Sequence, residues 1–132
     1  MENVYEPDNN DVLEWVADKG DGWPAGDWDY YVMNGKNDDL VFELANDLTC
    51  PKRDFFLHSL YYLVGDFINE RRVNEGKINE AKHRRIFRLI DMVDDQSVED
   101  VKEWRDRAVK IFSCDDEFDP HFWMNYMFWK SE

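Results

Sequence analysis

Hydrophobic residues recur at steps of three and four positions through most of this chain, the spacing that gathers them on one face of an α-helix. The stretches with this spacing are residues 11–19, 38–48, 51–72, 78–93 and 97–112, and a short aromatic stretch follows at residues 120–129. No segment shows the sustained alternation of apolar and polar residues that is typical of a strand. The pattern therefore predicts an all-α protein, a single compact domain of about six helices over residues 1–132.

Turn-forming and helix-capping residues separate these stretches. Gly20 is placed to end the first helix, and "GDGWPAGD" over residues 20–27 predicts a loop because it holds three glycines and one proline. The segment that follows, "WDYYVMNG", fits either a short helix or an extended piece. The expected helix-start residues are Asp38 or Asp39, Pro51, Ser97 with Asp100 in a variant of the capping box, and Asp119 followed by Pro120.

The longest stretch, "DFFLHSLYYLVGDFINERR" over residues 54–72, is apolar around most of its helical circumference. Its polar residues His58, Tyr62, Asp66 and Asn69 follow at steps of three or four, so they form one narrow stripe, here called the polar stripe. Two interpretations stay open. The simpler is that the stripe joins neighbouring helices or faces water, and the other is that it forms part of a surface for a partner.

Two residues of this helix need compensation from their surroundings. Gly65 costs about 1 kcal/mol relative to alanine in a helix interior, so we expect another helix to approach closely there. Asp66 needs a cation if it is buried, and the expected partners are Arg71, Arg72 or an arginine of the next helix.

The charge of the chain is strongly negative and unevenly distributed. The formal net charge is -14. Residues 1–47 hold 13 acidic and 2 basic residues, residues 48–90 hold 5 and 9, and residues 91–132 hold 12 and 5. Nucleic-acid binding is not expected, because phosphate contacts need lysine and arginine. A basic protein partner fits this charge, although acidity also serves solubility alone.

Composition bounds the remaining classes. Aromatic residues make up 16% of the chain, which favours a packed core over disorder despite 35% charged residues. Cys50 and Cys114 match no metal-binding spacing, and a reduced, cytoplasmic protein is the simpler interpretation. The first residues show no signal peptide, and no apolar run approaches the ~20 residues of a membrane helix.

Motifs for catalysis, cofactors and metals were sought and not found. The chain contains no dinucleotide-binding, phosphate-binding, zinc-protease or serine-hydrolase motif. His58, His83 and His121 fall in different predicted helices, and Cys50 lies about two helical turns, or ~12 Å, from His58. The cluster "CDDEFD" lacks the spacing of a calcium loop. We therefore expect no catalytic residues, no metal and no cofactor.

The best candidates for a partner surface combine acidic and aromatic residues, since charges steer an encounter and rings anchor it. Such combinations occur near both ends of the chain. The polar stripe is a second candidate. The first set consists of Asp18, Asp21, Trp23, Asp27, Trp28 and Asp29 near the start, and of Asp115, Asp116, Glu117, Asp119 and Trp123, with Trp129 beyond, near the end.

The segment "CPKRDFFLHSLYYLVGDFI" resembles a Cys-Pro-Lys/Arg-Arg…Phe-Leu-His…Leu-Tyr…Val-Gly-Asp pattern of small bacterial immunity proteins that belong to polymorphic toxin systems, including contact-dependent growth inhibition. The resemblance covers Thr49 to Arg72, less than a fifth of the chain. It implies a cytoplasmic antidote that binds the toxic domain delivered by a neighbouring cell. Such proteins act by occlusion, so the resemblance carries over no catalytic residue and no contact residue.

The sequence thus favours an acidic helical immunity protein, monomeric when free, that neutralises a basic toxin domain, with a nuclease as one candidate class. The alternative is a helical adaptor or chaperone-like scaffold that uses the aromatic tail to bind peptides. An enzyme ranks behind both.

Overall fold

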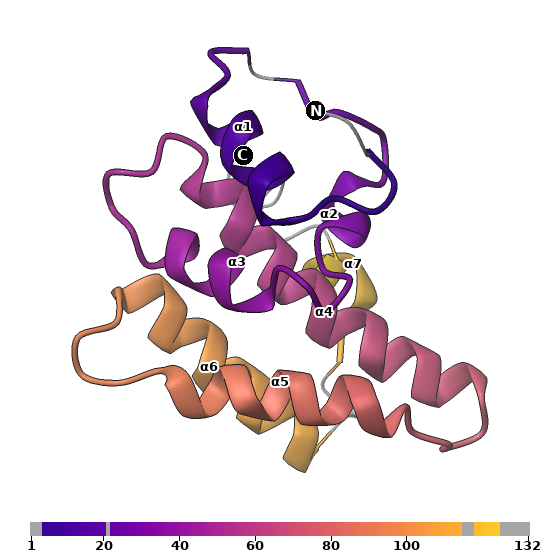
Figure 1. Ribbon diagram of the computed structural model, residues 1–132. Helices are drawn as coiled ribbons and strands as arrows, with labels where there is room; N and C mark the ends of the chain where they lie inside the picture. Colours follow the sequence, from indigo (N-terminus) through magenta and orange to yellow (C-terminus); the bar gives the residue numbers. More distant parts are fainter. Residues whose placement is uncertain (1–3, 21, 115–117, 125–132) are drawn as a thin grey trace.

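The computed structural model describes residues 4–20, 22–114 and 118–124 and places them in an all-α fold (Figure 1). Within these residues there is no strand. The helices are α1 (Asn9–Ala17), α2 (Trp28–Tyr31), α3 (Asp38–Ala45), α4 (Arg53–Val73), α5 (Glu80–Met92), α6 (Glu99–Ser113) and α7 (Pro120–Met124). The all-α prediction is confirmed, and the ambiguous segment around residue 30 is the short helix α2, which brings the described helices to seven.

Helix α4 is the centre of the fold, and α2, α3, α5, α6 and α7 all contact it. Its 21 residues make it about 30 Å long, enough to reach across a domain of this size. Figure 1 shows α1, α2 and α3 over its first half, and the α5–α6 hairpin along its other side. Because neighbours surround it, α4 buries apolar side chains around most of its circumference, as the sequence predicts.

Aromatic rings pack the first turns of α4 against α1 and α2. The ring of Trp15 lies 4.9 Å from that of Trp28 and 4.7 Å from that of Phe55, both edge to face. Phe55 and Phe56 contact each other at 5.2 Å in the same geometry. Edge-to-face pairs add about 0.5–1.5 kcal/mol each to the burial of the rings themselves. This cluster holds the N-terminal third of the chain on α4.

Two predicted helix starts on α3 and α4 are wrong. Pro51 lies outside α4, whose N-cap is Lys52. Asn37, not Asp38 or Asp39, is the N-cap of α3, and its buried amide donates instead to the carbonyl oxygens of Pro7 and Val32, at 2.8 and 3.0 Å. At α3, contacts with Pro7 and Val32 thus occupy the side chain of the N-cap residue.

The predicted capping box of α6 does not form. Val98 is the N-cap, and the hydroxyl of Ser97 accepts a hydrogen bond from the amide of Asp94 at 3.0 Å. Asp100 binds Arg53 of α4 at 2.6 Å. The predicted start of α7 is confirmed, since Pro120 begins the helix and the carboxylate of Asp119 accepts the amide of His121 at 3.0 Å. The predicted continuation to Trp129 lies outside the described residues. Both thiols are free, Cys50 buried and Cys114 exposed.

Candidate partner-binding surface

The first residue of the polar stripe, His58, is covered by the segment that precedes α3. Its side chain is 1% exposed, and Nε2 lies 2.9 Å from the carboxylate of Asp29 on α2. The ring of Trp23 lies 6.0 Å from the imidazole. The fold thus joins two sets of sequence candidates, but it buries them at this point. The structural interpretation of the stripe is confirmed for His58.

The rest of the stripe is half-buried and reaches α5. Asp66 accepts a hydrogen bond from Nζ of Lys82 at 2.6 Å, and Lys82 also donates to Glu70 at 3.3 Å. Partial burial alone lowers the pKa of Lys82, but the bonds and charges of both carboxylates outweigh it and raise that pKa.

The predicted cations for Asp66 were therefore the wrong residues. Arg71 and Arg72 stand five and six positions further along α4, off the three- and four-residue spacing that brings helical side chains together. The partner, Lys82, comes from the next helix. Gly65 is buried in α4, as a close helix approach requires, and the approach itself stays a prediction.

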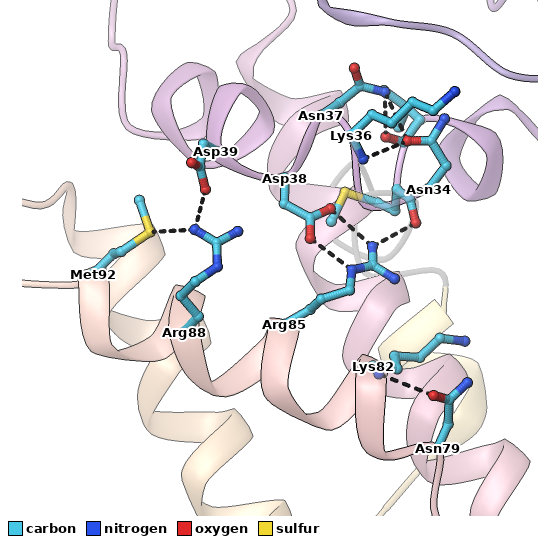
Figure 2. A network of polar contacts seen from close by, with 12 residues as sticks. Asn34, Lys36, Asn37, Asp38, Asp39, Asn79, Lys82, Arg85, Arg88 and Met92 are labelled. Carbon is cyan, nitrogen blue, oxygen red and sulfur yellow. Dashed lines mark hydrogen bonds and ion pairs between the residues drawn. The ribbon is translucent and has the colours of Figure 1, made fainter.

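A ladder of ion pairs joins α5 to the start of α3 (Figure 2). Arg85 binds Asp38 through Nε at 2.7 Å and Nη2 at 2.9 Å, and Nη2 also donates to the carbonyl of Met33 at 2.8 Å. The side chain of Asp38 is only 1% exposed. One turn along α5, Arg88 pairs with the exposed Asp39. The ladder uses cations of α5 to neutralise acids of α3.

Many of the lysine and arginine residues that give residues 48–90 their positive charge thus bind groups of the same chain. Lys52 donates to the carbonyl oxygen of Asp18 at 2.8 Å and also to that of Trp15, and Arg53 binds Asp100. Together with the α5 contacts, these bonds pair Lys52, Arg53, Lys82, Arg85 and Arg88 with groups of the same chain.

One hollow of about 650 Å³ lies between α3 and the turn that joins α5 to α6. It collects the carboxylates of Glu43, Asp47 and Asp94, together with Asp39, which pairs with Arg88. Phe42, 7% exposed, and Met92, 37% exposed, supply apolar surface in it. None of the described lysine or arginine residues lines it. We call it the acidic groove, and its lining residues are Asp39, Phe42, Glu43, Asn46, Asp47, Met92, Asp94, Gln96 and Ser97.

Local hydrogen bonds keep two of the groove carboxylates in place. The hydroxyl and the amide of Thr49 both donate to Asp47, at 2.6 and 2.9 Å, and hold the pKa of that carboxyl below its ordinary value. Asp94 accepts the amide of Gln96 at 2.9 Å. Both side chains are therefore held by local hydrogen bonds, and Asp47 in addition favours its ionised form, which can bind a cation.

A second hollow, of about 380 Å³, lies between α2, α4 and α5 and is rich in tyrosine. The rings of Tyr5 and Tyr31 lie 5.4 Å apart, those of Tyr30 and Tyr31 6.0 Å, and those of Tyr30 and Tyr62 6.2 Å. Tyr5 is 69% and Tyr30 49% exposed. We call it the tyrosine cleft, and its lining residues are Tyr5, Glu6, Tyr30, Tyr31, Met33, Asn34, Tyr62, Leu63, Asp66, Asn79, Lys82 and Arg85.

The two hollows include residues from opposite ends of α5. Figure 2 shows Met92 and Lys82 at these ends, with Arg88 and Arg85 between them. Lys82 lines the tyrosine cleft and Met92 the acidic groove, and these residues are ten positions apart, or about 15 Å along the helix axis. A standard protein interface covers roughly 800 Å² on each partner. One partner is therefore large enough to cover both hollows at once.

The acid-and-aromatic candidates near the chain start divide between core and surface. Asp18 and Asp27 are exposed and Trp23 is half-buried. Trp28 is fully buried and Asp29 is 7% exposed, so neither is a surface residue. An indole ring contributes most by burial, and here it fills the junction of α1, α2 and α4. Asp21 lies outside the described residues.

The candidates near the chain end also divide between core and surface. Asp119 is exposed and caps α7. Trp123 is 4% exposed and packs 5.3 Å from the ring of Tyr61, so its expected role as a surface anchor is wrong. The remaining members of this set, Asp115, Asp116, Glu117 and Trp129, lie outside the described residues.

Sequence reasoning missed both hollows. The tyrosine cleft joins Tyr5 to Tyr30 and Tyr62, residues far apart along the chain. The pair Tyr30-Tyr31 beside acidic residues was a usable signal, but the ambiguous structure of its segment hid it. The acidic groove joins the end of α3 to the turn after α5, and no local pattern indicates that contact.

Other kinds of site find no support in the described residues. Among them, no three His, Cys, Asp or Glu side chains converge to hold a metal ion. None of their helices has both the length and the apolar character to cross a bilayer. No protein-family model matches the chain, and neither curated proteins nor solved structures match it. Function is therefore inferred from the surface itself.

Proposed function

We propose that this chain is an immunity protein that binds a basic toxin domain in the cytoplasm and blocks its active or substrate-binding surface. The acidic groove carries the proposal. Its lining presents the carboxylates of Glu43, Asp47 and Asp94 over an apolar floor, while its fourth carboxylate, Asp39, pairs with Arg88 in the ladder. The local resemblance of residues 49–72 to immunity proteins supports the same function.

The mode of inhibition follows from this chemistry. Carboxylates bind lysine and arginine through charge-assisted hydrogen bonds, and an exposed apolar side chain such as Met92 supplies contact area at the centre. If the toxin is a nuclease, its basic surface must hold phosphates. The groove then competes for the same cations and excludes the nucleic acid.

The alternative, a peptide-binding adaptor, draws less support. It assigns peptide binding to the aromatic tail, but Phe122 and Trp123 pack against Tyr61 of α4, at 6.1 and 5.3 Å. These two rings therefore pack against α4, and the later aromatic residues of the tail, Tyr126, Phe128 and Trp129, lie outside the described residues.

Co-expression tests the proposal directly. The partner to use is a toxin domain encoded beside this gene, expressed in a bacterial host with and without the present chain. We expect the wild-type chain to restore growth and to co-purify with the toxin domain. Failure both to protect cells and to bind this domain would overturn the proposed function.

Groove variants locate the interface. Replacing Glu43→Gln, Asp47→Asn and Asp94→Asn together should slow association with the toxin domain and flatten its dependence on salt. The control changes charge equally at exposed sites elsewhere, with Glu75→Gln, Glu80→Gln and Asp106→Asn. Equal rates for the two triple variants would remove the groove from the interface.

A further inference from the structure

The tyrosine cleft has the composition of a site for a cation. Its rings come from three separate parts of the chain, with Tyr5 before α1, Tyr30 and Tyr31 on α2, and Tyr62 on α4. Ring faces of tyrosine attract lysine, arginine and other cations within about 6 Å. The exposure of Tyr5 and Tyr30 leaves such ring surface accessible from solvent.

The cleft's own cations already have partners. Among the described residues that line it, Lys82 and Arg85 are the positively charged ones. Lys82 binds Asp66 and Glu70, and Arg85 makes a two-point contact with Asp38. A ligand anion would have to compete with these carboxylates. A ligand cation does not have to displace Lys82 or Arg85 from these carboxylates, because it contacts the tyrosine rings, while the paired carboxylates offset the charge of both residues.

The electrostatic potential in the cleft also favours a bound cation. Burial, followed by the charges of Asp29, Asp66 and Asp27, raises the pKa of the Tyr62 phenol to about 12. Negative groups that oppose a phenolate in the cleft also favour a positive charge there.

We propose that the tyrosine cleft binds one lysine or arginine side chain of the toxin partner, with its cationic group against the rings of Tyr30 and Tyr62. The inference rests on the proposed function, since it assigns a specific contact within the same interface. A volume of about 380 Å³ is near the lower end of the roughly 300–1,000 Å³ of small-molecule pockets, which suits one long side chain. The partner would then carry a second basic cluster about 15 Å away for the acidic groove.

Single-residue peptides test the cleft without the toxin. The probes are four capped pentapeptides, Gly-Gly-X-Gly-Gly, in which X is arginine, lysine, norleucine or glutamate. Each is titrated into the ¹⁵N-labelled full chain at 150 mM salt, and amide chemical shifts are followed by NMR. We expect saturable shifts at Tyr30, Tyr31 and Tyr62 with the arginine and lysine peptides, and none there with norleucine or glutamate.

Substitutions of the cleft tyrosines distinguish a contact with the rings from a general attraction of cationic peptides to an acidic protein. Tyr30→Leu and Tyr62→Leu should each weaken binding of the arginine peptide by about two- to fivefold. Leu48→Ala, at an exposed apolar site elsewhere, is the control and should leave binding unchanged. Tyr30 is half exposed, so its variant should fold even if the Tyr62 variant does not.

Three results would overturn the inference: no saturable shift at the cleft, shifts centred on the acidic groove, or equal binding of the norleucine peptide. These outcomes are independent of the proposed function. If cleft binding fails while the chain still protects cells from the toxin, the cleft assignment is wrong and the immunity function stands. If the cleft binds cationic peptides but the chain neither binds nor neutralises the toxin domain, the immunity function fails and the cation site remains.

Discussion

At the scale of single residues, the buried contact between Asp29 and His58 ties α2 to α4. His58 is 1% exposed, so loss of its partner leaves a polar group in the core without that hydrogen bond. We expect Asp29→Ala to lower the free energy of unfolding by about 1–3 kcal/mol, measured by urea denaturation. Asp27→Ala, two positions away at an exposed site, should change it by less than about 0.5 kcal/mol. Similar losses for both variants would mean that the buried contact contributes no more than a surface charge.

Ionisation of the Tyr62 phenol makes the stability of the folded protein depend on pH in the alkaline range. Its pKa is about 12 in the folded protein, against about 10 in an unfolded chain, so the folded state holds this proton more tightly. The resulting stability is fully present below pH 10 and is lost as the pH rises through 12. Tyr62→Phe should therefore lose less stability than wild type between pH 10 and 12, as followed by circular dichroism melts. Tyr5→Phe is the exposed control, and an alkaline loss in Tyr62→Phe equal to wild type would contradict the assignment.

At the scale of elements, the ladder between α3 and α5 compares a buried and an exposed ion pair on one helix. Arg85→Ala leaves Asp38, 1% exposed, without its cation, and should destabilise the protein by about 3–5 kcal/mol. Arg88→Ala breaks a pair whose side chains are 49% and 69% exposed, and should cost at most about 1 kcal/mol. Thermal melts of both variants measure the contrast, and equal shifts would show that burial does not govern these pairs.

Gly65 tests how closely another element approaches α4. It is buried, so Gly65→Leu should overpack its surroundings and cost about 1–3 kcal/mol. Gly26→Ala is the control, because nothing lies within 4 Å of the added Cβ. An unchanged melting curve for Gly65→Leu would remove the expected helix contact.

The same scale shows what could be predicted from the sequence. Periodicity located α4, α5 and α6 because helical spacing is local. The predicted N-caps were wrong where a side chain from another helix binds the expected capping residue. Arg53 binds Asp100, and Arg85 binds Asp38. The hollows were missed for a similar reason, since their lining residues meet only after the helices pack. Trp28 was misjudged because an acidic neighbourhood in sequence does not reveal burial.

At the scale of the whole molecule, the net charge of -14 and the acidic groove oppose the stability of the free protein. Like charges gathered on one surface repel each other and lower the stability of the free protein. Such charges are retained at a binding surface because they bind the partner. The groove therefore has a signature that a purely structural feature lacks. Neutralising it should stabilise the free protein and weaken the complex.

The groove variant Glu43→Gln, Asp47→Asn, Asp94→Asn makes this measurable. The amide oxygens can still accept the hydrogen bonds that Thr49 and Gln96 donate, so mainly charge is lost. We expect the free variant to unfold at a higher urea concentration and to depend less on added salt than wild type, because the relief of repulsion among three carboxylates exceeds what the ionised Asp47 gains from its hydrogen bonds with Thr49. The matched triple variant at Glu75, Glu80 and Asp106 should show a smaller gain, because those acids do not share one hollow. Loss of stability in the groove variant would show that these carboxylates support the fold, and would withdraw the main argument for a binding role.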